Sequence, residues 1–282
     1  MTNFKKDKTT SWCPGCGNFP LLDAYADALS ELGLEKEEVV VVSGIGQAAK
    51  IPHYINSNGF QGLHGRALPV AFGVKAANPK LTVIVNTGDG DGYGEGGNHF
   101  IHAIRRNIDI THLVHDNQIY GLTKGQGSPT TSLGQATSMQ LHGVTSKPFN
   151  PMLTALSAGC GFVARAYVGD KQKLKDIIKA AINHKGYSII DIFQPCVTFN
   201  KVNTYEYYKN NTYYLDDSHD PSDFEKALLL AAKEDEKLPL GIIYQKKSDD
   251  YLALNPHVEK GLLMDNYDIN KIKSVIMKKI SY

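Results

Sequence analysis

The chain has 282 residues, 42% of them hydrophobic, which is enough for one large domain or two small ones with a substantial core. Its 30 Lys and Arg residues nearly balance 29 Asp and Glu residues, so the net charge of +1 argues against nucleic-acid binding. No apolar run approaches the length of a membrane span, and the N-terminal segment MTNFKKDKTTSW lacks the apolar core of a signal peptide. With four cysteines and no export signal, we expect a soluble cytoplasmic protein in a reducing compartment.

The first motif along the chain is the cysteine pair Cys13 and Cys16, in the sequence SWCPGCGN. The Pro and Gly between them form a tight knuckle that turns both sulfurs to one side. Such a pair fits zinc, an iron–sulfur cluster or redox thiol chemistry. A thioredoxin-like site would follow a strand, whereas only a polar segment precedes this pair. An amphipathic helix is predicted next, over residues 19–34.

A buried strand predicted for residues 38–43 leads into GIGQAA at residues 44–49. This segment matches the G-x-G-x-x-A pattern of Rossmann dinucleotide sites. Such a site also needs an acidic residue about twenty positions further on. None occurs between Glu38 and Asp89, so an NAD-dependent dehydrogenase ranks last among the functions that we consider.

Three histidines follow this motif. His64 lies in the segment LHGRA, before a helix predicted to end near residue 77, and by itself it would be a capping or core residue. His99 and His102 share one face of a crossover helix predicted for residues 94–106. Because no third ligand accompanies them, we interpret this pair as structural.

At the centre of the chain, polar side chains follow two predicted strands. The strand at residues 81–85 leads to GDGD at residues 88–91, and the strand at residues 110–114 leads to Asp116 and Asn117. Parallel strands joined by a crossover helix end at one edge, so both groups can face one ion. Magnesium accepts few carboxylates and fills its octahedron with phosphate oxygens, which glycine-turn amides can also bind. The pattern predicts a magnesium diphosphate site; the alternative is an ordinary Gly- and Asp-rich turn.

The remainder of the chain continues an α/β pattern. A polar loop of 22 residues, 127–148, is long enough to act as a functional cover or a partner-binding loop. Cys160 is predicted to be a small buried residue. From residue 200 the sequence becomes rich in tyrosine, and its strand could join a sheet edge. Helices are predicted for residues 151–158, 171–184, 223–236 and 269–280, and strands for residues 162–166, 188–193 and 240–244.

The motifs WCPGCGN, SGIGQAAK, LHGRA, GDGDG, HDNQIYGLTKGQGSPT and FQPC occur in this order between Trp12 and Tyr244. Together they resemble the β subunits of 2-oxoacid:ferredoxin oxidoreductases, especially the 2-oxoglutarate-type and broad-specificity members. The resemblance implies an α/β thiamine-diphosphate-binding fold, a mostly parallel sheet flanked by helices, at residues 1–199, with a C-terminal extension at residues 200–282 packed on it. The implied reaction converts a 2-oxoacid, 2-oxoglutarate in preference to pyruvate, to acyl-CoA and CO₂, and electrons pass to ferredoxin.

The resemblance also implies roles for individual residues. The magnesium ligands are expected to be Asp89, Asn117 and the backbone carbonyl of Ile119. The residues expected to contact thiamine diphosphate are Ile45, Gly46, Gln47, Ala48, His64, Gly90, Asp91, Gly121 and Leu122. Lys50 and Lys124 are expected to meet substrate carboxylates, with His64 as a further catalytic residue. Lysine suits this role because it offers a flexible point charge.

The similar β subunits hold one [4Fe–4S] cluster with four cysteines. Cys13, Cys16 and Cys196 match three of them, but Gln47 stands at the fourth position. Glutamine is a poor iron ligand because its amide oxygen is neutral and hard, and Ser57 is a conceivable substitute. We expect a [4Fe–4S] cluster. A cluster with a non-cysteine ligand, a three-iron cluster or no cluster are the open outcomes.

The resemblance implies that this chain acts with partners. The glutamate that activates thiamine diphosphate resembles a residue of an α subunit, and no glutamate here lies in a matching motif. The implied partners are this α subunit, alone or with γ- or δ-type subunits, ferredoxin, coenzyme A and a 2-oxoacid. Neither nucleic acid nor a membrane is expected. Two alternatives remain open: a non-redox thiamine-dependent decarboxylase, and a non-catalytic cofactor-binding subunit.

Overall fold

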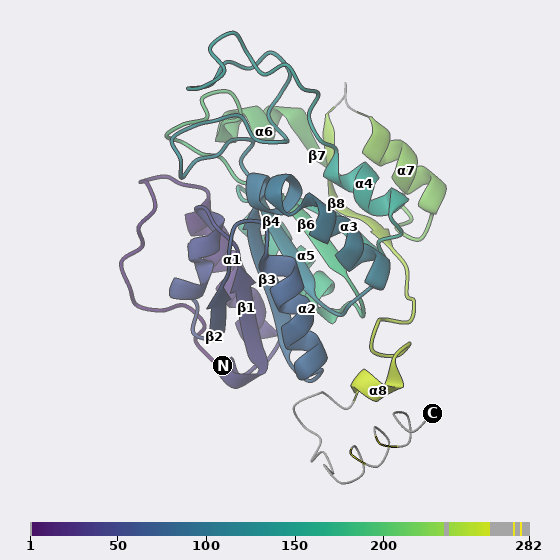
Figure 1. The fold of residues 1–282 in the computed structure, drawn as a ribbon. Helices are drawn as coiled ribbons and strands as arrows, with labels where there is room; N and C mark the ends of the chain where they lie inside the picture. Colours follow the sequence, from purple (N-terminus) through teal and green to yellow (C-terminus); the bar gives the residue numbers. More distant parts are fainter. Residues whose placement is uncertain (1, 234–236, 260–272, 274–276, 278–282) are drawn as a thin grey trace.

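The computed structural model describes residues 2–233, 237–259, 273 and 277, and its described part contains one eight-stranded sheet (Figure 1). The strand order is β2-β1-β3-β4-β6-β5-β8-β7. The strands are β1 (Val39–Ser43), β2 (Asn58–Gln61), β3 (Thr82–Gly88), β4 (Thr111–Asp116), β5 (Phe162–Tyr167), β6 (Ser188–Phe193), β7 (Thr212–Tyr214) and β8 (Leu238–Gln245). All neighbours pair in parallel except β5 and β8; β8 joins the sheet beside β5, as the sequence suggested, but β7 pairs with its other side and forms the edge.

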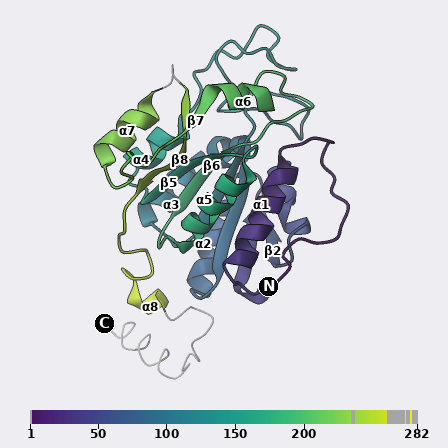
Figure 2. The same ribbon diagram turned by 180° about the vertical axis from the view of Figure 1, so that it is seen from behind.

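Helices cover both faces of the sheet. Those described are α1 (Asn18–Glu31), α2 (Ala67–Ala77), α3 (Gly97–Arg106), α4 (Pro151–Ser157), α5 (Lys171–Asn183), α6 (Tyr205–Asn211), α7 (Phe224–Ala232) and α8 (Pro256–Glu259). α2, α3, α4 and α7 pack on one face, whereas α1 and α5 pack on the other, which Figure 2 presents to the viewer. The predicted α/β class with a mostly parallel, helix-flanked sheet is confirmed.

The sheet is apolar on both faces because both faces are covered by helices. In β1, Val40 and Val42 belong to the core beneath α2 and α3, while Val39 and Val41 belong to the core beneath α1 and α5. All four side chains are buried. Burial of each such side chain contributes about 1.5–3 kcal/mol, which explains why the strands read as continuous apolar runs.

Several boundaries differ from the predicted ones. The helix predicted for residues 19–34 ends at Glu31, and Gly33 takes a left-handed φ of +68° in the following turn. The helix predicted from residue 94 begins at Gly97, because a π-helical turn, Gly90–Glu95, precedes it. The GDGDG segment is therefore not an ordinary turn. π-Helical turns occur preferentially at functional sites.

Among the α-helices and strands that the structure describes, four short ones were not predicted, namely β2, α6, β7 and α8. None of them has the long apolar run or the sustained periodicity on which sequence patterns depend. The helix predicted for residues 223–236 ends at Ala232, with residues 234–236 outside the description. The helix predicted for residues 269–280 also lies outside it, apart from Lys273 and Met277. Within the described chain, no helix is both long and apolar enough to cross a bilayer.

Candidate functional site

Four neighbouring strands, β1, β3, β4 and β6, end at the same edge of the sheet, where polar and glycine-rich turns follow each of them. In Figure 1 the irregular segment between β4 and α4 arches over this upper edge, with α6 nearby. Ligands of open α/β sheets bind at this carboxyl edge. The turn after β1 enters a 3₁₀ helix, Ala48–His53, and not an α-helix, which removes the helix N-terminus that a Rossmann site needs.

A pocket opens at this edge. Its lining residues are Ile45, Gly46, Gln47, Ala48, His64, Gly88, Asp89, Gly90, Asp91, Asn117, Ile119, Tyr120, Gly121, Leu122 and Thr123. Every residue predicted to contact thiamine diphosphate or magnesium is among them. His64, which by itself suggested a capping or core role, is more than one third exposed and faces the pocket. Tyr120, by contrast, was not singled out from the sequence.

Asp89 lies at the centre of a buried group of carboxylates. The hydroxyl of Thr130 is 2.6 Å from Asp89 Oδ2 and 2.8 Å from Asp116 Oδ1. Burial raises the pKa of Asp89 to about 6, against hydrogen bonds from Ser128 and Thr130 that lower it. Burial, followed by the charges of Asp191 and Asp89, raises the pKa of Asp116 well above its usual range.

These carboxylates leave an excess of negative charge. The guanidinium of Arg165 pairs with Asp191 at 3.1 Å, but no ion pair joins a described cationic side chain to Asp89 or Asp116. Two buried carboxylates around one hydroxyl are costly without a counter-charge. A divalent cation that binds oxygen ligands would supply that charge.

The turn after β4 carries the other two residues expected to supply oxygen ligands, Asn117 and Ile119. Asn117 is nearly buried, and its side chain accepts a hydrogen bond from the Ile119 amide at 3.2 Å. Gln118 between them takes a left-handed φ of +56°. A search of the described residues finds no group of three or more His, Cys, Asp or Glu side chains placed to hold a metal ion. The donor set is one carboxylate, one amide oxygen and one backbone carbonyl, which suits Mg²⁺ completed by phosphate and water.

Two glycines are required by close packing around the pocket. A Cβ atom at Gly90 would lie 2.2 Å from Cε1 of Tyr120, and one at Gly44 would lie 2.1 Å from Oδ2 of Asp91. Neither distance is compatible with a side chain. Glycine is therefore the residue that fits at both positions.

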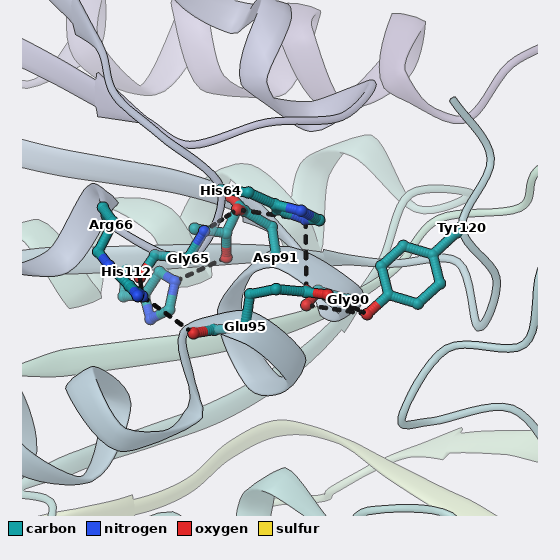
Figure 3. Close-up of polar contacts among 9 residues, drawn as sticks. His64, Gly65, Arg66, Gly90, Asp91, Glu95, His112 and Tyr120 are labelled. Atoms are coloured by element: carbon teal, nitrogen blue, oxygen red, sulfur yellow. Dashed lines mark hydrogen bonds and ion pairs between the residues drawn. The ribbon is translucent and has the colours of Figure 1, made fainter. Parts of the chain in front are cut away.

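A polar network borders the pocket (Figure 3). The amide of Gly65 donates to Asp91 Oδ1 at 2.6 Å, and burial raises the pKa of Asp91 to about 6. His64 Nε2 lies 3.7 Å from Asp91 Oδ1 and 3.4 Å from Glu95 Oε2. The hydroxyl of Tyr120 donates to Glu95 Oε2 at 3.0 Å. His64 thus stands between two carboxyl groups, where it can hold or transfer a proton.

The two predicted substrate lysines do not line the pocket. Nζ of Lys50 donates to the carbonyl of Ser11 at 3.1 Å. Lys124 follows the lining residue Thr123 and takes a left-handed φ of +77°. Both lysines are next to pocket-lining turns, so their predicted role remains a prediction.

Among the predicted cysteine ligands, Cys196 lies next to Gly121, a residue that lines the pocket. The Cys16 amide donates to the Cys13 carbonyl at 3.0 Å, which forms the expected knuckle. Burial raises the pKa of Cys16, and the charges of Cys196 and Cys13 raise it further. A Cβ built at Gly121 would lie 3.4 Å from Cys196 Sγ and 4.0 Å from Gln47 Cγ.

Gln47 lies near Cys196, and within the described chain its side chain has an oxygen atom without a hydrogen bond. Its Oε1 atom is buried and has no hydrogen-bond partner among the residues that the structure describes. Among the described residues no group of three or more Cys, His, Asp or Glu side chains is placed to hold a metal ion, so the iron–sulfur cluster stays a prediction. Ser57, the conceivable substitute, donates instead to the carbonyl of Asn58. Cys160 is buried in the core, as predicted, and burial raises its pKa to about 12.

Family models match almost the whole described chain. Residues 39–192 match the C-terminal thiamine-pyrophosphate-binding domain of thiamine pyrophosphate enzymes. Residues 196–260 match the C-terminal region of the pyruvate ferredoxin oxidoreductase β subunit.

Similar proteins agree with these models. The chain is 48% identical over 255 residues to a 2-oxoacid:ferredoxin oxidoreductase β subunit of Saccharolobus solfataricus, covering 86% of this chain and 84% of that one. It is 45% identical over 198 residues to a 2-oxoglutarate oxidoreductase subunit of Mycobacterium tuberculosis, covering 70% of this chain and 53% of that one.

A solved structure shares the complete fold. The 2-oxoglutarate:ferredoxin oxidoreductase of Magnetococcus marinus, with 2-oxoglutarate, coenzyme A and succinyl-CoA bound, superposes with a TM-score of 0.91 at 37% identity. It covers 96% of this chain and 94% of that one. The chain therefore belongs to the β subunits of the 2-oxoacid:ferredoxin oxidoreductases, enzymes with a thiamine-pyrophosphate domain that work with an α subunit.

Proposed function

We propose that this chain binds thiamine diphosphate and Mg²⁺ at the carboxyl-edge pocket and, with an α subunit, oxidatively decarboxylates a 2-oxoacid to acyl-CoA. The observation that supports this most is the convergence of all the predicted cofactor and magnesium contacts on one pocket. Asp89, Asn117 and the Ile119 carbonyl would hold the cation. The glycine turns around Gly90 and Gly121 would bind the diphosphate.

When bound, thiamine diphosphate supplies the carbon nucleophile that 2-oxoacid decarboxylation requires. The chain's own residues orient the reactants. Lys50 and Lys124 would attract substrate carboxylates as flexible cations. His64, which lies between Asp91 and Glu95, would be positioned near the reacting groups of the cofactor and the substrate. The similarity to proteins named for 2-oxoglutarate supports that substrate over pyruvate.

The redox partners are part of the same proposal. Cys13, Cys16 and Cys196 would bind a [4Fe–4S] cluster that passes electrons to ferredoxin, with Gln47 at its fourth corner. Coenzyme A would accept the acyl group; the solved relative binds it. The four cysteines are all free thiols, which supports a location in the reducing cytoplasm.

Calorimetric titration of thiamine diphosphate, with and without Mg²⁺, tests the proposal. The unaltered chain should bind only with Mg²⁺, and Asp89→Ala should abolish binding while the fold persists, because it removes the only ligating carboxylate. Asp27→Ala is the matched control, since Asp27 pairs with Lys171 at the surface, where the loss of an ion pair costs little. Undiminished affinity in Asp89→Ala would refute the magnesium assignment.

Turnover of the complex with the α subunit separates the remaining alternatives. We expect 2-oxoglutarate- and CoA-dependent reduction of a one-electron acceptor. Release of an aldehyde without acceptor reduction would indicate a non-redox decarboxylase. Cofactor binding without any turnover would indicate a non-catalytic subunit.

A further inference from the structure

The loop between β4 and α4 has a buried beginning and an exposed middle. Ser128, Thr130 and Thr131 are 7%, 4% and 1% exposed, although all three are polar. Leu141, further along the same loop, is 75% exposed. The usual pattern, with polar side chains outside and apolar side chains inside, is reversed here. Polar side chains are buried only where they have hydrogen-bond partners, so their partners explain the arrangement.

Those partners belong to the candidate cation site. The Thr130 hydroxyl contacts Asp89 Oδ2 at 2.6 Å and Asp116 Oδ1 at 2.8 Å. The Thr131 hydroxyl donates to the carbonyl of Gln118 at 2.6 Å. The beginning of the loop therefore attaches to both strand ends that carry the predicted magnesium ligands. Among the described residues, Thr130 is the one whose side chain is hydrogen-bonded to both Asp89 and Asp116.

A single hydroxyl in this place restricts the geometry of Asp89. With Oδ2 held by Thr130, the carboxylate cannot rotate freely about its Cβ–Cγ bond, so the direction of Oδ1 is also restricted. The hydroxyl separates the two carboxylates as well.

We propose that Thr130 is a positioning residue of the cation site: its hydroxyl, between Asp89 and Asp116, holds the Asp89 carboxylate in the orientation that binds Mg²⁺. The inference rests on the proposed function, because it takes Asp89 as the magnesium ligand. It adds that the loop at residues 127–148 is a structural component of the cofactor site and not only a connection between β4 and α4. Loss of the Thr130 hydroxyl weakens cation binding, whereas loss of a hydroxyl elsewhere in the loop does not.

Two substitutions separate positioning from general loop stability. Thr130→Val removes the hydroxyl with little change of shape, and Thr130→Ser retains the hydroxyl. Thr137→Val is the matched control in the same loop. The Thr137 hydroxyl makes hydrogen bonds with Gln140, including one from the Gln140 amide at 3.1 Å, and none with a carboxylate.

The experiment titrates Mg²⁺ by calorimetry into the full chain with saturating thiamine diphosphate, with melting temperatures recorded for each variant. We expect the dissociation constant for Mg²⁺ to rise about tenfold to hundredfold in Thr130→Val, which is the range for hydrogen bonds to charged groups. Thr130→Ser should restore it to within about fourfold, which corresponds to about 0.8 kcal/mol for one buried methyl group. Thr137→Val should bind Mg²⁺ like the unaltered chain, even if its melting temperature falls.

Unchanged or tighter Mg²⁺ binding in Thr130→Val would overturn the positioning role. Equal weakening in Thr137→Val would also overturn it, since loop stability would then be the cause. If the unaltered chain itself does not bind thiamine diphosphate with Mg²⁺, the proposed function fails and not merely this inference. The two failures are therefore distinguishable in one series of titrations.

Discussion

At the scale of single residues, the candidate site is dominated by buried acids. Asp89 and Asp91 both have pKa values raised to about 6, chiefly because burial disfavours their charged forms. Above that pH they are ionised at a cost in stability that a bound cation would offset. No ion pair with a described cationic side chain gives Asp89 a counter-charge, which a bound cation would supply.

We predict that Mg²⁺ affinity depends on pH through Asp89. Because its pKa in the folded chain is raised to about 6, the carboxylate is protonated below that pH, and protons then compete with the cation. Affinity should be constant above pH 7 and fall about tenfold per pH unit well below the pKa. Calorimetric titrations from pH 5 to 8 would measure this profile. Magnesium binding to free thiamine diphosphate must be measured alongside and subtracted; a flat corrected profile would contradict the prediction.

Gly90→Ala should disrupt the pocket. Its Cβ would lie 2.2 Å from the Tyr120 ring, so the ring must move, at a cost of about 1–3 kcal/mol for such overpacking. We expect lower thermal stability and at least tenfold weaker thiamine diphosphate binding. Gly97→Ala is the matched control, since no atom lies within 4 Å of its added Cβ. Similar affinities in the two variants would show that the close approach at Gly90 is unimportant.

At the scale of elements, the site is assembled from turns and not from helix faces. The π-helical turn Gly90–Glu95 places Asp91 and Glu95 around His64. The long loop contributes Thr130 at its beginning and exposes apolar side chains beyond it, including Leu133, Met139 and Leu141. Exposed apolar side chains next to a shared active site are typical of a partner interface.

Leu141→Ser should therefore weaken association with the α subunit. Burial of a leucine side chain at an interface contributes about 1.5–3 kcal/mol, which corresponds to at least a tenfold change in the dissociation constant. Leu229→Ser on α7 is the control, because Leu229 is also exposed, at 67%, but does not belong to the loop. Binding of the purified subunits, followed by light scattering or calorimetry, measures the difference. If both variants associate equally, the loop is not part of the interface.

At the scale of the whole molecule, the chain is the β subunit of an enzyme that works with an α subunit, and its sheet carries the pocket. The continuous sheet places the cofactor pocket and the three cysteines at one edge, with Gly121 between Cys196 and Gln47. A cluster held by these cysteines, as proposed, would lie beside the proposed cofactor, and electron transfer requires such a short separation.

Iron and acid-labile sulfide should be measured on the complex purified without oxygen. We expect about four irons per β chain, since three cysteines lie together and Gln47 Oε1 has no other partner. Gln47→Cys should hold the same iron content and lose it more slowly in air, because thiolate is the stronger ligand. About three irons would mean that Gln47 leaves the fourth corner vacant. An absence of iron would contradict the redox proposal for this subunit.

The amino-acid sequence by itself determined the sheet's inner strands, the α/β class and the set of residues around the pocket. It could do so because runs such as Val39–Ser43 are apolar on both faces and because parallel strands must end at one edge. Only the tertiary structure identified Thr130, which lies 41 and 14 residues from its partners Asp89 and Asp116. It also decided that GDGDG winds into a π-helical turn and that Tyr120 lines the pocket, where its hydroxyl donates to Glu95. Contacts between distant segments depend on how the chain folds back on itself, so local sequence patterns do not predict them.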